Sequence, residues 1–185
     1  RPNICRFLHI PLQSGSESVL RRMGRRYSAG EYREAVAYVT ERLSGLGLGT
    51  DVITGFPGET EADFQETARL LADLPFNLLH VFPYSPRPGT RAAELSGRVA
   101  PSVARERAAI LREWGARQRA AFARAWVGRP VEMVVETRTE EGGGEGWTGE
   151  YLPAWVEGGG TSIGHRVRGV PRRVEGDRLL VFQGS

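Results

Sequence analysis

Three short apolar runs, each followed by a polar loop and then by a helix-forming segment, constrain the fold of this chain more than any other feature. The runs cover residues 5–12, about 49–54 and 78–84, and their length and composition are typical of buried strands. Strands that alternate with helices through short connections form parallel sheets covered by helices. We therefore expect an α/β sheet whose polar loops meet at its carboxyl edge, where such folds bind ligands.

The helices are predicted by their capping residues and their periodicity. Ser28 and Glu31 form the pattern of a capping box before a helix over about 31–43, and Thr60 and Asp63 begin the next helix. A third, arginine-rich helix is expected over about 102–125. The residues expected on the inner faces are Tyr32, Ala35, Val36, Val39 and Leu43 in the first helix, Phe64, Thr67, Ala68 and Leu71 in the second, and Val103, Ile110, Leu111, Trp114 and Phe122 in the third.

The chain changes character beyond Gly128. The runs "PVEMVVET", "EYLPAWVE", "HRVRGV" and "RLLVFQ" are strand-like and are interrupted by glycine-rich segments such as "EEGGGEG". They predict a small all-β barrel of about the size of an OB-like nucleic-acid module, so we expect domains over residues 1–126 and 127–185. Three strands cannot close an α/β barrel. If the first domain has that architecture, we expect its first half to precede this chain, which would then be a piece of a longer protein.

Composition argues against several kinds of site. The single cysteine, Cys5, can form no intrachain disulfide and cannot by itself ligate an iron–sulfur cluster. His9, His80 and His165 lack the spacing of a zinc site, so we expect no metal ligands. His9 and His80 lie inside apolar strands and are expected to be hydrogen-bonded histidines of the core. No Ser-His-Asp set, Walker loop or pair of acids is recognisable, so no catalytic residue is predicted. Without a long apolar segment or a leader, we expect no membrane partner and a cytoplasmic location.

The basic residues are unevenly distributed. Residues 101–130 hold 7 arginines and 2 acidic residues, whereas residues 131–185 hold 6 arginines and 9 acidic residues. The arginine-rich helix is therefore either a solvated face or a surface that attracts a polyanion such as RNA. Because the tail is net acidic, it could bind RNA through charge only with a local cluster of arginines. Stacking of RNA bases on aromatic side chains is the competing mode of binding. The cluster is Arg166, Arg168, Arg172 and Arg173, and the rings are Trp147, Tyr151 and Trp155.

The polar loops offer groups suited to a small anionic ligand. Gln13, Ser14 and Ser16 have donors and acceptors for a ribose or an amino-acid group, although the serines also suit capping of a helix from Glu17. One of Arg22, Arg25 and Arg26, about one helical turn further on, would bind a carboxylate through two parallel bonds, whereas at least one of them is expected to serve only solubility at the surface.

The second loop, "GFPGET", has glycines at 55 and 58 that allow close approach of a flat ligand. Glu59 either caps the next helix or faces the ligand. In the third loop, "YSPRPGT", the residues expected to close the same edge are Tyr84, Ser85, Arg87 and Thr90.

In their order and spacing these loops resemble the methylthiotransferase family of radical S-adenosylmethionine (SAM) enzymes. The resemblance rests on "HIPLQSGSESVLRRMGRRY", "TDVITGFPGETEADFQET" and "HVFPYSPRPGTRAAEL" and covers about residues 5–125. The tail, with "GWTGEYLPAWVE", more loosely resembles the TRAM domain of that family. The resemblance implies the C-terminal half of a radical SAM partial (β/α)6 TIM-like barrel, followed by a small all-β TRAM barrel.

The resemblance also implies functions for individual residues. Gln13, Ser14 and Ser16 would line the pocket for S-adenosyl-L-methionine, and Arg25 would bind its methionyl carboxylate. The segment 51–58, with Asp51, Gly55 and Gly58, would border the adenine and ribose. The ligands of the 4Fe-4S clusters would lie outside this chain, in the missing N-terminal half, so the chain alone is expected to be inactive. The partner would be tRNA, contacted by the arginine cluster of the tail.

The third loop is most similar to family members that add a methylthio group at C2 of N6-threonylcarbamoyladenosine, next to the anticodon. Three alternatives remain at this point. They are an enzyme for isopentenyladenosine in tRNA, an enzyme for a ribosomal protein, and a non-catalytic RNA-binding fragment.

Overall fold

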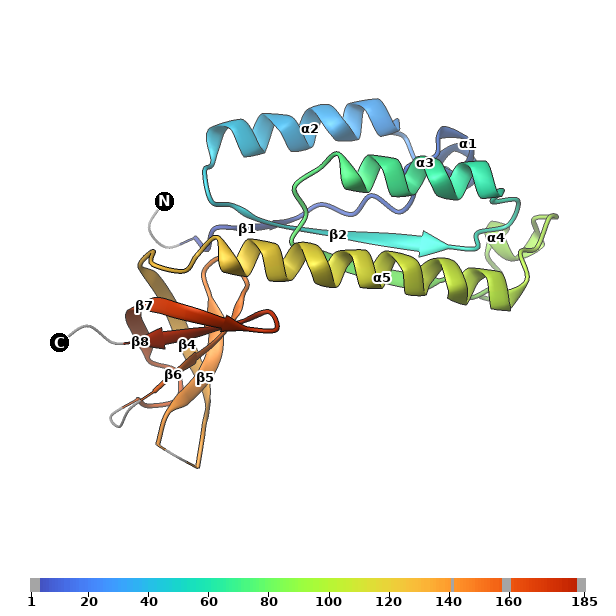
Figure 1. The fold of residues 1–185 in the computed structure, drawn as a ribbon. Helices are drawn as coiled ribbons and strands as arrows, with labels where there is room; N and C mark the ends of the chain where they lie inside the picture. Colours follow the sequence, from blue (N-terminus) through green and yellow to red (C-terminus); the bar gives the residue numbers. More distant parts are fainter. Residues whose placement is uncertain (1–3, 141, 158–160, 183–185) are drawn as a thin grey trace. The chain divides into compact units, whose positions relative to one another are not determined.

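The computed structural model describes residues 4–140, 142–157 and 161–182 of the chain. It forms two compact units, and each is described by itself. One unit comprises His9–Ser44 and Leu48–Gly115, and the other comprises the remaining described residues, which lie in the ranges 4–8, 45–47 and 116–182. The division falls at Gly115, within the long helix α5 (Pro101–Arg124), which is drawn in yellow-green in Figure 1.

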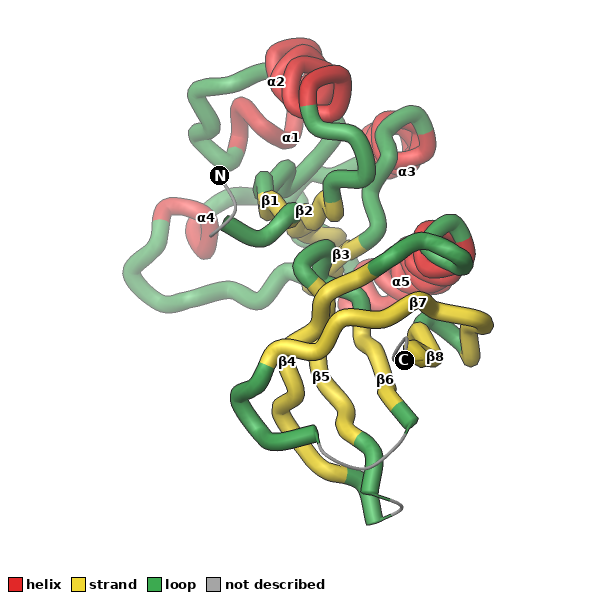
Figure 2. Tube along the Cα trace, turned by 90° about the vertical axis from the view of Figure 1, so that its left-hand side faces the viewer, coloured by secondary structure: helices red, strands yellow, loops and turns green. Residues whose placement is uncertain are grey.

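The first unit is an α/β structure built on a three-stranded sheet. The strands β1 (Phe7–His9), β2 (Gly47–Thr54) and β3 (Leu78–Pro83) lie in that order, and β2 and β3 run parallel with Asp51 opposite His80. Helices α2 (Ala29–Arg42) and α3 (Glu61–Ala72) pack with the first part of α5 on the same face of the sheet (Figure 2). The short helices α1 (Glu17–Arg22) and α4 (Arg91–Glu94) belong to the loops that follow β1 and β3. The predicted helix-covered parallel sheet is confirmed, but β1 is shorter than the predicted run 5–12, and β1 and β3 are not the buried strands expected, because only one face of the sheet is covered.

The capping residues begin their helices as predicted. The Ser28 hydroxyl accepts a bond from the backbone N–H of Glu31, and the Glu31 carboxylate accepts one from Ser28, which completes the capping box of α2. Thr60 and Asp63 form the same reciprocal pair at the start of α3. Each box satisfies backbone donors that a helix start would otherwise leave unpaired.

The inner faces of the helices agree with the prediction in part. In α3 the buried side is the predicted one, but in α2 Ala35 is exposed and Leu43 is 46% exposed. Leu43 is exposed because the helix has ended there, and its backbone at φ −126° has left the helical conformation. In α5 the predicted inner residue Ile110 is 50% exposed, and the small residues Ala104 and Ala108 are buried instead. Small residues allow α5 to approach the sheet closely and so set which side faces inward.

The second unit contains a closed five-stranded β-barrel. Its strands β4 (Val131–Arg138), β5 (Gly144–Thr148), β6 (Pro153–Val156), β7 (Arg166–Glu175) and β8 (Arg178–Phe182) are joined in the order β4-β5-β6-β8-β7. The predicted small all-β barrel is therefore confirmed. A strand begins inside the segment interpreted from sequence as a glycine-rich break. Glycine is required there, because a Cβ on Gly146 would lie 1.7 Å from the carbonyl oxygen of Val134 on the neighbouring strand.

No helix in the described part of the chain has the length and apolar character needed to cross a membrane.

Candidate functional site

A cavity of about 690 Å³ opens where β2 and β3 end, and it is lined by residues of the first and third predicted loops and by side chains of the two strands. A cavity of this size is typical of sites for small molecules. The loops meet here because parallel strands carry the segments that follow them to the same edge of the sheet. The main lining residues are Gln13, Arg25, Asp51, Ile53, Phe82, Tyr84, Ser85, Arg87 and Thr90.

Gln13 reaches the cavity through an unusual backbone conformation. Its φ is +69°, in the left-handed region that residues other than glycine seldom adopt. Two backbone bonds hold it there, from Gln13 N to Asp51 O at 2.8 Å and from Ile53 N to Gln13 O at 2.9 Å. These bonds continue the sheet beyond the end of β1. Strain of this kind, held by neighbouring structure, is frequent at binding sites.

Arg25 is directed to the cavity by the way α1 ends. Gly24 adopts φ +71°, its N–H bonds to Arg21 O at 3.0 Å, and the N–H of Arg25 bonds back to Leu20 O at 3.0 Å. This pattern is a Schellman motif, which needs glycine at the left-handed position. Arg26 is not among the residues that line this cavity. The structure therefore places Arg25, and not its neighbour, beside Asp51 and Arg87.

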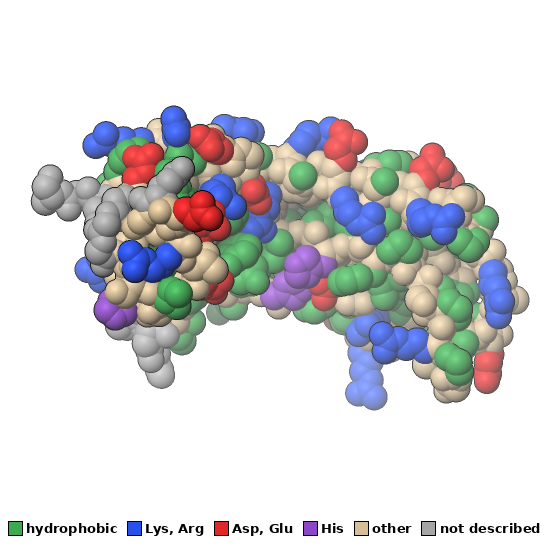
Figure 3. Space-filling view, turned by 90° about the horizontal axis from the view of Figure 1, so that it is seen from below, with side chains coloured by type: hydrophobic (Ala, Val, Ile, Leu, Met, Phe, Trp, Pro, Cys, Tyr) green, Lys and Arg blue, Asp and Glu red, His purple; other side chains and the backbone are tan. Residues whose placement is uncertain are grey.

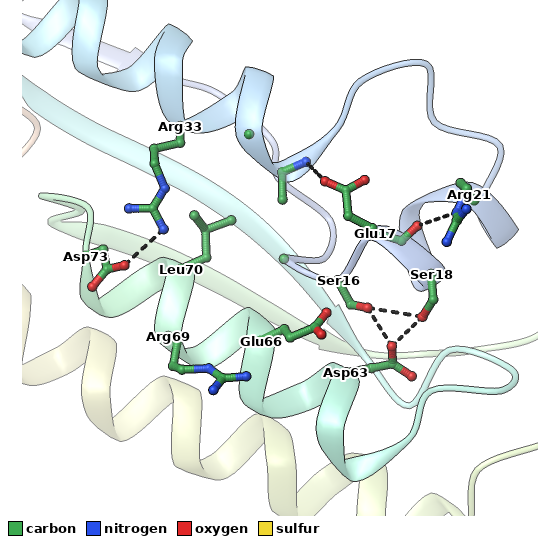
Figure 4. A pocket seen from close by; sticks show the side chains of 13 residues that line it. Ser16, Glu17, Ser18, Arg21, Arg33, Asp63, Glu66, Arg69, Leu70 and Asp73 are labelled. Atoms are coloured by element: carbon green, nitrogen blue, oxygen red, sulfur yellow. Dashed lines mark hydrogen bonds and ion pairs between the residues drawn. The ribbon is translucent and has the colours of Figure 1, made fainter.

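The serines of the first loop lie away from this cavity. Ser14 and Ser16 are fully buried. The hydroxyls of Ser14 and Thr67 are 3.2 Å apart, and the Ser16 hydroxyl donates to Asp63 Oδ1 at 2.5 Å. Figure 4 shows Ser16 and Ser18 converging on Asp63, at the edge of a second cavity between α1, α2 and α3. The contacts of Ser14 and Ser16 with α3 position the loop that carries Gln13.

Asp63 is the centre of this arrangement. Burial alone would raise its pKa, but hydrogen bonds from Ser16, Ser18 and Thr60 hold the pKa well below its usual range. The adjoining Gly15 fits only as glycine, because a Cβ there would lie 2.6 Å from the backbone Cα of Thr67. The first loop is thus tied to α3 by an ionised carboxylate and by close backbone contact.

The "GFPGET" loop is shaped by its glycines. Gly55 and Gly58 have φ of +75° and +78°. A Cβ on Gly55 would lie 2.3 Å from the Cβ of Ala104, and Gly58 N donates to Gly97 O at 2.6 Å. Gly55 lines a neighbouring cavity with Tyr84, and neither glycine is among the residues that line the first cavity. Both glycines therefore determine the path of the loop behind the site.

The buried side chain of Glu59 links this loop to helix α5. Its Oε1 accepts bonds from Gly55 N at 3.0 Å and from the Arg107 guanidinium at 2.6 Å. The side chains of Glu59 and Arg107 are only 3% and 8% exposed. Burial raises the pKa of the Glu59 carboxyl, and the two bonds oppose that rise. Sequence reasoning missed Arg107. Its position among Ala104, Ala108 and Leu111 on one helical face was the available signal.

The described residues offer no site for an iron–sulfur cluster. Cys5 is exposed and is the only cysteine of the chain. A 4Fe-4S cluster requires several thiolates, so its ligands would have to come from elsewhere.

The arginines of the β-barrel are partly neutralised. Arg166 and Arg168 project from the outer side of β7, and both bind the carboxylate of Glu132, at 3.1 and 2.7 Å. The bonds from Arg168 and Arg166 lower the pKa of Glu132. Arg173 pairs with Glu175, and Arg172 lies over the ring of Phe182. The four predicted RNA-binding arginines thus share one strand, and three of them have acidic partners.

Two of the candidate stacking rings are already stacked within the protein. Tyr151 lies between Trp147 and Phe7, with ring centroids at 4.7 and 4.6 Å. Its backbone adopts φ +62°. A base would have to displace one of these rings to stack on Tyr151, so Trp155, which is half-buried on β6, is the better placed of the three.

The chain is similar in sequence to a known superfamily and to several known proteins. The Radical SAM superfamily matches residues 1–71. The threonylcarbamoyladenosine tRNA methylthiotransferase of Thermotoga maritima is 35% identical over 167 residues, which are 90% of this chain and 38% of that protein. A tRNA-2-methylthio-N(6)-dimethylallyladenosine synthase of Thermus thermophilus is 42% identical over 77% of this chain and 30% of the relative. The synthase of Parafrankia is 47% identical over 72% of this chain and 27% of the relative.

The first 71 residues, which include β1, β2 and the loop that carries Gln13 and Arg25, thus resemble the Radical SAM superfamily. Within that superfamily, the chain resembles the methylthiotransferase family over most of its length. It spans 27% to 38% of the length of the three relatives.

Proposed function

We propose that this chain binds and orients S-adenosylmethionine within a tRNA methylthiotransferase. The observation that carries the proposal is a cavity that brings together guanidinium, carboxylate, amide and aromatic groups from two loops and from strands β2 and β3. The sheet would be half of the partial (β/α)6 barrel of such an enzyme, and the β-barrel would be its TRAM domain. Iron–sulfur clusters would be ligated elsewhere in the same protein and would not be held by this chain.

The residues around the cavity fit the chemical groups of the proposed cofactor. A guanidinium can hold the methionyl carboxylate through two parallel bonds, and we assign this to Arg25. The carboxylate of Asp51 and the amide of Gln13 suit hydroxyl or ammonium groups. The rings of Phe82 and Tyr84 offer apolar surface for the adenine. When bound, S-adenosylmethionine supplies the radical chemistry of the family, and these side chains orient it and limit access of water.

The remaining predicted site residues would act by shaping the cavity. Ser14 and Ser16 would hold Gln13 in place through α3, and Gly55 and Gly58 would set the course of the second loop. The substrate would be tRNA, which the outer side of β7 would contact through its arginines. A tRNA substrate is consistent with the expected cytoplasmic location.

Among tRNA substrates we favour threonylcarbamoyladenosine. The support is the third loop, which places Arg87 in the cavity, and the Thermotoga relative, which covers most of this chain. The dimethylallyladenosine synthases are more identical over a smaller part of the chain, and they support the second candidate. Mass spectrometry of tRNA nucleosides separates the two. The whole protein would be expressed in cells that lack both modifications, and restoration of only the dimethylallyl product would reject our choice.

Cofactor binding is tested by a matched pair of variants in the whole protein. Loss of a charge-assisted bond costs about 1.5 to 3 kcal/mol, so Arg25→Ala should bind S-adenosylmethionine roughly tenfold to a hundredfold more weakly in calorimetry. Arg26→Ala is the control, because the cavity does not include Arg26, and it should bind within about twofold of the unaltered protein. Equal affinity in Arg25→Ala would refute the assignment of Arg25. An effect confined to Arg26→Ala would show that the neighbour makes the contact.

A further inference from the structure

His9, Asp51 and His80 converge although they come from three different strands. His9 Nε2 lies 2.9 Å from Asp51 Oδ1, and His80 Nδ1 lies 3.2 Å from the same oxygen. The two imidazole rings are 5.4 Å apart. The three ligand atoms lie within 4.8 Å of one another.

The sheet itself brings these side chains together. Asp51 and His80 are directly opposite in the β2–β3 register, and the bond from Ile10 N to Gly49 O aligns the end of β1 with them. Successive side chains of a strand point to opposite faces. Val52 and Val81 are buried in the core with the helices, so Asp51 and His80 project from the other face. Near the middle of Figure 3, histidine side chains (purple) lie at the surface next to an acidic side chain (red) and hydrophobic side chains (green).

The site is open to solvent, so the prediction that His9 and His80 are core histidines is wrong. The exposed fractions of the side chains are 29% for His9, 25% for Asp51 and 48% for His80. An ion can therefore enter without unfolding, and water can complete its coordination. Two imidazole nitrogens and one carboxylate oxygen are ligands that Zn²⁺ and related divalent transition metals favour.

We propose that His9, Asp51 and His80 form a binding site for a divalent transition-metal ion of the zinc type. Ligands at about 2.0 to 2.2 Å around a tetrahedral ion are about 3.3 Å from each other. The two nitrogen-to-oxygen distances in the structure are close to that value, so small side-chain movements suffice. On binding, each histidine exchanges its bond to Asp51 for a bond to the metal. A neutral imidazole then keeps its one proton on the other ring nitrogen, whereas a charged imidazole releases one proton to water.

This site goes beyond the proposed function and does not depend on it. It also departs from the expectation that the chain holds no metal ligands. Spacing rules detect ligands on one short segment, whereas these three are separated by the β1–β2 and β2–β3 crossovers. Because Asp51 also lines the cofactor cavity, a bound ion would lie beside that cavity.

The test uses the 185-residue chain with Cys5→Ser, which removes the one thiolate that could bind zinc on its own. The protein is first treated with a chelator. Binding of Co²⁺ is then measured from its visible ligand-field absorption, and binding of Zn²⁺ is measured by calorimetry. We expect one ion per chain. His9→Gln and His80→Gln should each weaken binding at least about tenfold, whereas His165→Gln, at the histidine on the β-barrel unit, should leave it unchanged.

Thermal unfolding supplies a second readout, because an ion that binds only the folded state raises the unfolding midpoint. Zn²⁺ should raise the midpoint of the Cys5→Ser chain and of His165→Gln, but not that of His80→Gln. The proposal is overturned if the Cys5→Ser chain takes up no stoichiometric ion, since the cluster is then only a hydrogen-bonded group. It is also overturned if both histidine variants retain full affinity. S-adenosylmethionine is absent throughout, so neither result bears on the proposed function.

Discussion

The buried pair of Glu59 and Arg107 gives the sharpest prediction about stability. Arg107→Met keeps much of the length of the side chain but leaves the Glu59 carboxylate, whose side chain is 3% exposed, without its cation. Breaking a buried ion pair from one side costs about 3 to 5 kcal/mol. The second carboxylate that Arg107 binds, Glu61, is 66% exposed and adds little. We therefore expect Arg107→Met to lower the free energy of unfolding of the α/β unit by about 3 kcal/mol or more.

The double variant Glu59→Met with Arg107→Met provides the critical comparison. It removes both charges together, so no uncompensated charge stays buried. Its cost should be mainly that of Gly55 N, which loses its acceptor, about 1 to 3 kcal/mol. The losses of unfolding free energy in the two single variants should therefore add up to at least about 2 kcal/mol more than the loss in the double variant.

Urea denaturation followed by far-ultraviolet circular dichroism measures these free energies, because helices α1 to α4 belong to the α/β unit. Arg105→Met is the matched control. Arg105 is an exposed arginine two positions away in α5, and its substitution should change stability by less than about 0.5 kcal/mol. If Arg107→Met costs less than about 1 kcal/mol, or if the single effects are additive, the pair does not hold the loop as described.

Three further predictions concern other parts of the chain. Asp63→Asn should destabilise the protein by about 2 kcal/mol near neutral pH. Because folding lowers the pKa of Asp63, the carboxylate stabilises the protein above its ordinary pKa, and this stabilisation is lost on acidification. The difference in unfolding free energy between Asp63→Asn and the unaltered protein should therefore become smaller below about pH 4 in urea titrations. Gly15→Ala should cost about 2 kcal/mol or more, because its Cβ would meet backbone, and a cost near zero in the same assay would contradict the close packing. In the whole protein, Glu132→Gln should release Arg166 and Arg168, tighten tRNA binding and steepen its salt dependence by about 0.7 to 0.9 slope units for each additional phosphate that the arginines neutralise. An unchanged slope would exclude these arginines from the interface with tRNA.

The sequence by itself determined the features that depend on residues close together in the chain or on the order of elements. The capping boxes at Ser28 and Thr60 form as predicted, because both partners of each box lie within one helical turn. The alternation of strands and helices placed Gln13, Arg25 and Arg87 at one edge, because parallel strands carry their following loops to the same side. The spacing of short strands in the tail likewise predicted a barrel.

Only the tertiary structure decided which polar side chains are buried and which are paired. Arg107 resembles the other arginines of its helix in sequence, yet it is buried because α5 packs closely against the second loop, with Ala104 next to Gly55. Ser16 could be interpreted as a ligand group until α3 placed Asp63 beside it. His80 looked like an isolated strand histidine until the sheet register set Asp51 opposite it. Burial and charge pairing depend on contacts between segments tens of residues apart, which local spacing does not encode.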